Sequence, residues 1–266
     1  MTNKQITIGS LFSGIGGFEL GLERAIPNSK TIWQCEQNTF AQKVLKKHWP
    51  DVPIYDDIKE MKHGSIDIVD IIVGGFPCQG VSQAGKGKGI AGDPRSNLWF
   101  EMLRIIDIVR PRIAIAENVT AITQKGRGMD LVISSLSKIG YDVEWIDVRA
   151  SDEGAPHKRE RIFFVAYPFS ERTKIPIEGK HPSVEMFGSK SEERKVNTYW
   201  SKGTIESPIC GMDDGIPNRV DRIRALGNAI VPQCSETIGK YVMKSGILDD
   251  IDEYRKIQKE MYSIPW

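Results

Sequence analysis

The stretch Ile6–Ala25, ITIGSLFSGIGGFELGLERA, decides the fold. Its first part, Ile6–Phe12, is mostly apolar and strand-like, whereas Phe18–Ala25 has the apolar spacing of an amphipathic helix. The three glycines between them permit a tight turn and let the backbone approach a ligand closely. This pattern predicts a strand, a turn and a helix. By itself it does not require a ligand, because a glycine-rich turn can also simply join a strand to a helix.

The strand and helix rhythm continues outward from this stretch through the first two thirds of the chain. Ile68–Val73 is an apolar run bounded by turn signals, typical of a strand buried on both faces of a parallel sheet. The further strands are expected at Thr31–Cys35, Ile113–Glu117, Asp142–Val148 and Arg161–Tyr167, and the further helices at Thr39–His48, Leu98–Val109 and Met129–Lys138. The rhythm predicts an α/β fold with an open, mostly parallel sheet and helices on both faces.

This rhythm stops near Pro168. Residues 169–210 are polar and without a clear period, which predicts a small inserted lobe or a long loop. Helical spacing returns in the segments Asn218–Leu226, Gln233–Lys244 and Asp249–Met261. We therefore divide the chain into a main domain, residues 1–167 with 212–266, and a small region, residues 168–211.

Composition sets broad limits on function. The chain has 266 residues, 36 Lys and Arg against 35 Asp and Glu, and a formal net charge of +1, so it is not a DNA-coating protein, although a local basic stripe is compatible with DNA binding. Its cysteines, Cys35, Cys78, Cys210 and Cys234, form no CxxC pair and have no histidine at zinc-ligand spacing, so we expect reduced thiols and no metal. Without a secretory signal or an apolar run of ~20 residues, a cytoplasmic protein with no membrane contact is expected.

The segment Gly74–Arg95, GGFPCQGVSQAGKGKGIAGDPR, is the strongest candidate for chemistry. It follows the buried strand, so Cys78 is expected at the carboxyl end of the sheet, where α/β enzymes bind their ligands. Pro77 fixes the backbone just before the thiol, and the glycine-rich loop after it carries Lys86 and Lys88. A lone cysteine at a strand end is most often an inert buried thiol. Together with a basic glycine loop, it suggests a nucleophile beside a phosphate backbone.

Acidic side chains follow two other predicted strands. Glu36 comes at the end of the second strand, where an acid can hydrogen-bond ribose hydroxyls. Glu117, in AENVTA, is expected on the same rim as Cys78, where a carboxyl group can donate a proton to a bound heterocycle or, alternatively, cap the following helix.

Two later segments also contain candidate functional residues. In HKRERIFFVAY, Arg159 and Arg161 alternate along a predicted strand and should point to one face, where buried arginines need an anion or a polar ligand. In RALGNAIVP, Gly227 and Asn228 predict a tight turn, with the next helix beginning near Pro232.

In this order, FSGIGG, GFPCQ, ENV, KRER and GNAIVP resemble the motifs of the DNA (cytosine-5) methyltransferase family, bacterial or phage type. The resemblance covers roughly residues 5–167 and 212–245. It implies a Rossmann-like S-adenosylmethionine-dependent methyltransferase fold, with residues 168–211 as a small target-recognition insertion. It also implies S-adenosyl-L-methionine as cofactor and double-stranded DNA as substrate.

The resemblance assigns roles to the matching residues. Cys78 is similar to the nucleophile, Glu117 to the acid that contacts N3 and the exocyclic amine of cytosine, and Arg161 to the arginine that holds O2, with Arg159 nearby to stabilise the thiolate or the catalytic loop. The implied cofactor-binding residues are Phe12 against the adenine, Gly14 and Gly16 in the turn, Glu36 on the ribose, Asp57 near the adenine amine, Pro77 and Asn228. The implied substrate-binding residues are Gln79, Ser82 and Asn118.

The chemistry explains these residue types. C5 of cytosine is a poor nucleophile, but addition of a thiolate to C6 makes C5 an enamine carbon that can accept a methyl group. Glu117 would favour this by donating at N3, which needs a raised pKa or a strong hydrogen bond. Because a stacked base is out of reach, the cytosine must be flipped out of the duplex.

The region expected to recognise the target is short, which leaves sequence specificity open. A tRNA cytosine-5 methyltransferase, a catalytically silent DNA-binding homologue and a nicotinamide-dependent oxidoreductase are the alternatives. The last leaves Cys78, Glu117 and the basic loop unexplained. We expect a monomer, which a cognate restriction endonuclease could accompany without direct contact.

Overall fold

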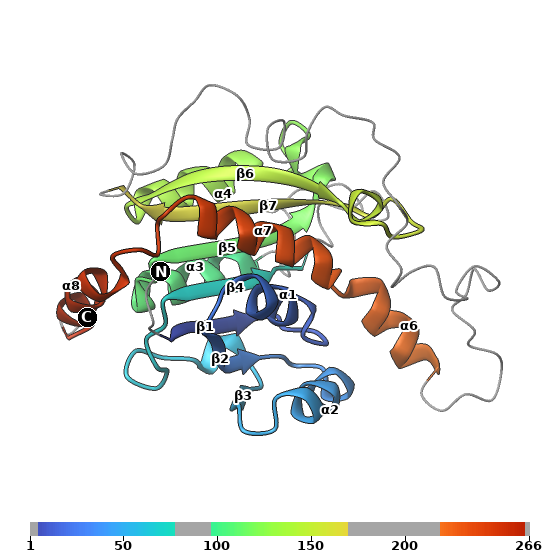
Figure 1. Cartoon of the computed structure of the whole chain (residues 1–266), viewed down its shortest axis with the longest axis horizontal. Coiled ribbons are helices and arrows are strands. Elements are labelled where there is room, and N and C mark those ends of the chain that lie inside the picture. The colour runs from blue at the N-terminus through green and yellow to red at the C-terminus, as the bar shows by residue number, and fades with distance from the viewer. Residues whose placement is uncertain (1–4, 78–96, 170–218, 264–266) are drawn as a thin grey trace.

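The computed structural model describes residues 5–77, 97–169 and 219–263 (Figure 1). In these residues seven strands form one sheet, in the order β3-β2-β1-β4-β5-β7-β6. The strands are β1 (Ile6–Leu11), β2 (Ser29–Cys35), β3 (Ile54–Tyr55), β4 (Ile71–Gly75), β5 (Ile113–Val119), β6 (Tyr141–Arg149) and β7 (Glu160–Pro168). The α-helices are α1 (Gly17–Ala25), α2 (Thr39–His48), α3 (Asn97–Val109), α4 (Met129–Lys138), α6 (Arg219–Asn228), α7 (Pro232–Lys244) and α8 (Ile251–Tyr262).

The sheet is mostly parallel, as predicted. From β3 to β5 every neighbouring pair is parallel, and only β7 runs against its two neighbours, β5 and β6. The short strand β3 was not predicted, because its two residues, which pair with Gln34 and Cys35, are too few to show a period.

Both faces of the sheet are buried, and each has its own hydrophobic core. On β4, Ile71 and Val73 point into the core with α1 and α7, whereas Ile72 points into the core with α3 and α4. Figure 1 shows α7 and α1 in front of the sheet and α3 and α4 behind it. This explains why the β4 region reads as an apolar run and not as an alternating strand.

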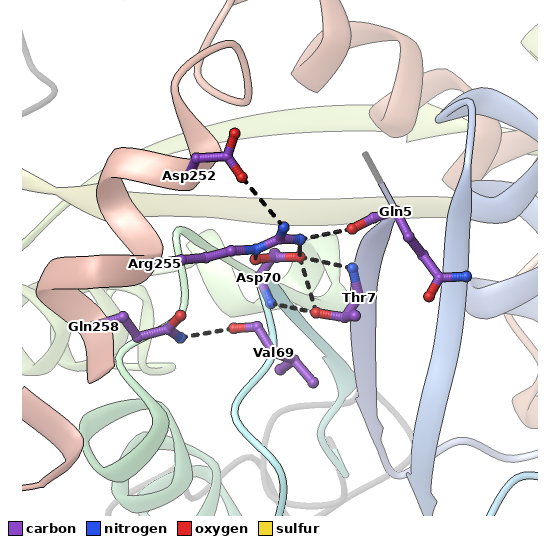
Figure 2. A network of polar contacts seen from close by, with 7 residues as sticks. All are labelled: Gln5, Thr7, Val69, Asp70, Asp252, Arg255 and Gln258. Atoms are coloured by element: carbon purple, nitrogen blue, oxygen red, sulfur yellow. Dashed lines mark hydrogen bonds and ion pairs between the residues drawn. The ribbon is translucent and has the colours of Figure 1, made fainter. Parts of the chain in front are cut away.

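The two ends of the sheet are covered differently. Helix α8 lies at the end where β1 begins, and α6 extends from the opposite end (Figure 1). At the α8 end, Arg255 contacts Asp70 and the carbonyl of Gln5, as Figure 2 shows. Asp70 lies within the predicted strand Ile68–Val73, but β4 begins only at Ile71. The Asp70 backbone still bonds to both neighbouring strands, since its amide donates to the Thr7 carbonyl and its carbonyl accepts from the Ile113 amide, each at 3.1 Å.

Candidate active site

A cavity of about 370 Å³ lies at the carboxyl ends of the parallel strands, a size typical of small-molecule sites. It collects residues from the turn after β1 and from β2, β4, β5, β7 and α6, which are far apart in sequence. The predicted site residues in its wall are Phe12, Gly14, Glu36, Asp57, Pro77, Glu117, Asn118, Arg161 and Asn228. Of the predicted residues, Cys78, Gln79 and Ser82 lie outside the described part of the chain.

The glycine turn and Glu36 form one side of this cavity. Gly14 and Gly16 have φ values of 57° and 86°, in the left-handed region that glycine tolerates best. Glu36 follows β2, and its Oε2 accepts a hydrogen bond from the Gly14 amide at 2.8 Å while its Oε1 accepts one from the Asn38 amide at 2.7 Å. The carboxylate therefore fixes the turn and also faces the cavity, close to Phe12 and Asp57.

Glu117 and Arg161 form an ion pair on the other side. Arg161 Nε lies 2.9 Å from Glu117 Oε1, and the register of the antiparallel strands β5 and β7 brings the two side chains together. Gly75 makes room for the carboxyl group, because a Cβ there would lie 2.9 Å from Glu117 Oε2. Burial raises the pKa of Glu117 above its usual value, although Arg161 and Arg159 oppose the shift. This carboxyl group is therefore suited to hold a proton.

Asn118 connects β5 to the segment before Cys78. Its buried amide donates a hydrogen bond to the carbonyl of Phe76 at 3.2 Å, and its side-chain oxygen accepts one from the Val119 amide at 2.8 Å. The hydrogen bond to Phe76 holds the backbone next to Pro77, which lines the cavity. Asn118 therefore fixes the backbone two residues before position 78 in the sequence.

Arg159 differs from its prediction. It precedes β7, which begins at Glu160, and its φ of 26° departs from strand geometry. Its guanidinium donates hydrogen bonds to the carbonyls of Gly227 and Ala229, at 2.9 and 2.5 Å. The prediction that Arg159 and Arg161 lie on one strand was wrong, because β7 begins at Glu160 and so contains Arg161 but not Arg159.

The GNAIVP segment also differs in detail. Gly227 and Asn228 form the last residues of α6, not a tight turn, whereas α7 begins at Pro232 as predicted. Helix α6 contributes two charged cavity residues that the sequence did not predict, Asp221 and Arg224. Their signal was helical spacing, because they precede Asn228 by seven and four positions and so share its face.

The described residues contain no group of histidine, cysteine and acidic side chains able to hold a metal ion. Among the helices in that part of the chain, none is long and apolar enough to cross a membrane.

Comparison with known proteins decides the family. The model of the C-5 cytosine-specific DNA methylase family matches residues 6–206. The chain belongs to this family. The match spans the glycine turn, Glu36, Glu117 and Arg161, as well as Cys78.

Individual relatives agree with this assignment. The chain is 34% identical over 225 residues to type II methyltransferase M2.BsuMI of Bacillus subtilis, covering 78% of the chain and 57% of the relative. It is 33% identical over 232 residues to type II methyltransferase M.DsaV of Dactylococcopsis salina, covering 86% and 63%. The chain thus spans less than two thirds of the length of either relative.

Among solved structures, the S. pombe Dnmt2 methyltransferase superimposes with a TM-score of 0.60, covering 93% of this chain and all of that one. At 14% sequence identity, this likeness shows the fold. It confirms the predicted Rossmann-like methyltransferase architecture.

Proposed function

We propose that this chain transfers the methyl group of S-adenosylmethionine to C5 of a flipped-out cytosine in double-stranded DNA. The buried, protonatable Glu117, held by Arg161 beside the backbone that leads into Cys78, is the observation that carries the proposal. A carboxyl group that keeps its proton can donate to N3 of a cytosine, which an ordinary exposed glutamate cannot do near neutral pH.

The cavity residues fit the cofactor. An aromatic side chain at Phe12 and acids at Glu36 and Asp57 suit an adenosine, with the ring against the base and the carboxylates toward its hydroxyl and amino groups. When bound, S-adenosylmethionine supplies an electrophilic methyl group. Phe12, Gly14, Gly16, Glu36, Asp57, Pro77 and Asn228 are the residues proposed to hold it.

In the remaining steps, the protein's own side chains act on the cytosine. The Cys78 thiolate forms a bond to C6 of cytosine, and the electron pair of the C5–C6 double bond is shifted toward C5 and the ring. Glu117 donates a hydrogen bond or a proton to N3 and so stabilises the charge that develops on the ring. Arg161 is positioned to hold O2, with Gln79, Ser82 and Asn118 as the proposed contacts around the base. After C5 has accepted the methyl group, a base removes the C5 proton, and the electron pair of that C–H bond re-forms the C5–C6 double bond and expels the Cys78 thiolate.

The names of the relatives support a modification role. Proteins called type II methyltransferases suggest that a restriction endonuclease recognising the same site accompanies this chain without direct contact. A DNA substrate would place its action in the cytoplasm, and we propose that it acts there as a monomer. Residues 168–211 are proposed to read the target, with the rest of the chain forming the catalytic and cofactor-binding domain.

The decisive experiment is transfer of tritiated methyl groups from S-adenosylmethionine to unmethylated duplex DNA, with Cys78→Ser as the inactive control. We expect label at C5 of cytosine with the wild type and none with the variant. Equal amounts of tRNA form the second arm. Label in tRNA alone would make the protein an RNA methyltransferase, and cofactor binding without label in either acceptor would contradict the proposal.

A further inference from the structure

The segment Gly227–Val231, which we call the linker, consists of the last two residues of α6 and the three residues that connect them to α7. Asn228 lines the cavity, and the Ile230 carbonyl packs so closely on α1 that a Cβ at Gly17 would lie 2.1 Å from it. Beyond the linker, Ser235 Oγ donates a hydrogen bond to the Gly17 carbonyl at 3.0 Å. The α7 end of the linker is therefore anchored to the glycine turn of the cofactor side.

The α6 end of the linker is held differently. From residue 220 to residue 228, α6 has no buried side chain, and its exposed apolar residues include Val220 and Leu226, at 71% and 51%. Little hydrophobic packing therefore fixes this helix against the body of the protein. Its last carbonyls, including that of Gly227, lack partners within the helix and lie at the negative end of the helix dipole.

Arg159 provides hydrogen-bond donors for the backbone carbonyl groups at the end of α6. Its two terminal nitrogens donate to the carbonyls of Gly227 and Ala229, so one guanidinium spans the end of α6 and the start of the linker. Arg161 is paired with Glu117, and burial, together with the like charge of Arg161, lowers the pKa of Arg159. Arg161 therefore contacts the proposed catalytic acid, Glu117, whereas Arg159 contacts the linker.

We propose that Arg159 is a positioning residue that holds the linker, and Asn228 with it, over the cofactor end of the cavity. It acts through the backbone of the linker, which places it between the Glu117–Arg161 pair and the cofactor site. The inference rests on the proposed function only in taking S-adenosylmethionine as the cofactor. It differs from the expected role of Arg159 at the thiolate or the catalytic loop.

Binding of S-adenosylhomocysteine to the full chain without DNA, measured by isothermal titration calorimetry, tests this proposal. We expect Arg159→Met to weaken binding about tenfold, because two charge-assisted hydrogen bonds to the linker are lost. Arg159→Lys should weaken it about threefold, since an ammonium group cannot span both carbonyls. The matched control is Lys158→Met, which changes an exposed neighbouring cation and should leave the Kd unchanged.

A double-mutant cycle separates positioning from a general loss of structure. If Arg159 acts through the linker, the effects of Arg159→Met and Asn228→Ala on the binding free energy should be non-additive. The reason is that Arg159 supports binding only by holding Asn228 in place. Additive effects, or an unchanged Kd in Arg159→Met while the wild type binds, would overturn the inference and leave the proposed function intact. A wild type that fails to bind S-adenosylhomocysteine would contradict the proposed function itself. Thermal melts of every variant show whether a weakened Kd comes from a folded protein.

Discussion

Both ends of the sheet bury a carboxylate next to an arginine, but they satisfy it to different degrees. At the amino end, the Asp70 side chain accepts from the amide and hydroxyl of Thr7 at 2.7 and 2.9 Å, and from two nitrogens of Arg255 at 2.7 and 2.5 Å (Figure 2). At the carboxyl end, Glu117 is paired with Arg161 at one oxygen, beside an open cavity.

The difference in the number of hydrogen-bond donors indicates a different role for each acid–arginine pair. At the amino end, the Asp70 carboxylate has four good donors and so connects α8 to the starts of β1 and β4. Glu117 has fewer donors, so burial dominates and its pKa is raised. Similar residue types are therefore proposed to serve stability at one end and proton donation at the other.

The largest effect that would sharpen this comparison is expected for Glu117→Gln. The amide keeps the shape but cannot transfer a proton, so kcat for DNA methylation should fall ~10²- to 10⁴-fold. The melting temperature should stay the same or rise, because an acid under a desolvation penalty is removed. Methyl-transfer kinetics and a thermal melt on one preparation give both values. A variant with wild-type kcat would remove Glu117 from the mechanism.

Arg255→Met is expected to give the opposite result. It leaves the buried Asp70 without its cation, which should lower the free energy of unfolding by about 2–3 kcal/mol, allowing for the partial exposure of Arg255. The kcat of the folded fraction should be unchanged. Urea unfolding measures the loss, and Lys256→Met, the adjacent exposed cation on α8, is the matched control. An equal effect of both variants would show that the pair does not hold α8.

A smaller effect is expected for Gln258→Leu at the same end. The buried amide of Gln258 donates to the carbonyls of Val69 and Val109 at 2.8 and 2.9 Å. Its loss leaves two carbonyls unpaired and should cost about 1–2 kcal/mol. Lys259→Leu, on the exposed face of α8, controls for the new leucine and should change stability by less than ~0.5 kcal/mol.

The smallest expected effect is the pH dependence of the stability difference between wild type and Glu117→Gln. Because the pKa of Glu117 is raised on folding, the folded state holds its proton more tightly than the unfolded state. The contribution of Glu117 to the free energy of unfolding is fully present below the usual pKa of a glutamate. It is lost as the pH rises through the raised pKa of Glu117 in the folded state. The wild type should therefore lose stability relative to the variant over this interval. Urea titrations across the acid range would show a constant difference if the shift were absent.

Much of this protein could be predicted from its sequence because the information is local. Ile6–Ala25 shows a strand, a glycine turn and a helix within twenty residues, and the strand ends place Glu36 and Glu117 on one rim. Apolar periodicity depends on neighbours in the chain, so it also predicted α7 and the end of the strand and helix rhythm near Pro168, where β7 ends. The resemblance to family motifs then implied roles for residues that physical pattern alone left open, and these roles stay predictions.

Only the tertiary structure decided which polar atoms meet. Asp70 and Arg255 are separated by 185 positions, and Arg159 and Gly227 by 68, so no local period connects them. Arginine side chains are long and can reach several partners, and the choice depends on where helices dock. For this reason the sequence determined the sheet, the rim and the chemical types of the site residues. The tertiary structure determined the partner of each arginine: the pairing of β5 with β7 brings Arg161 to Glu117, and the docking of α6 and α8 brings the linker to Arg159 and Arg255 to Asp70.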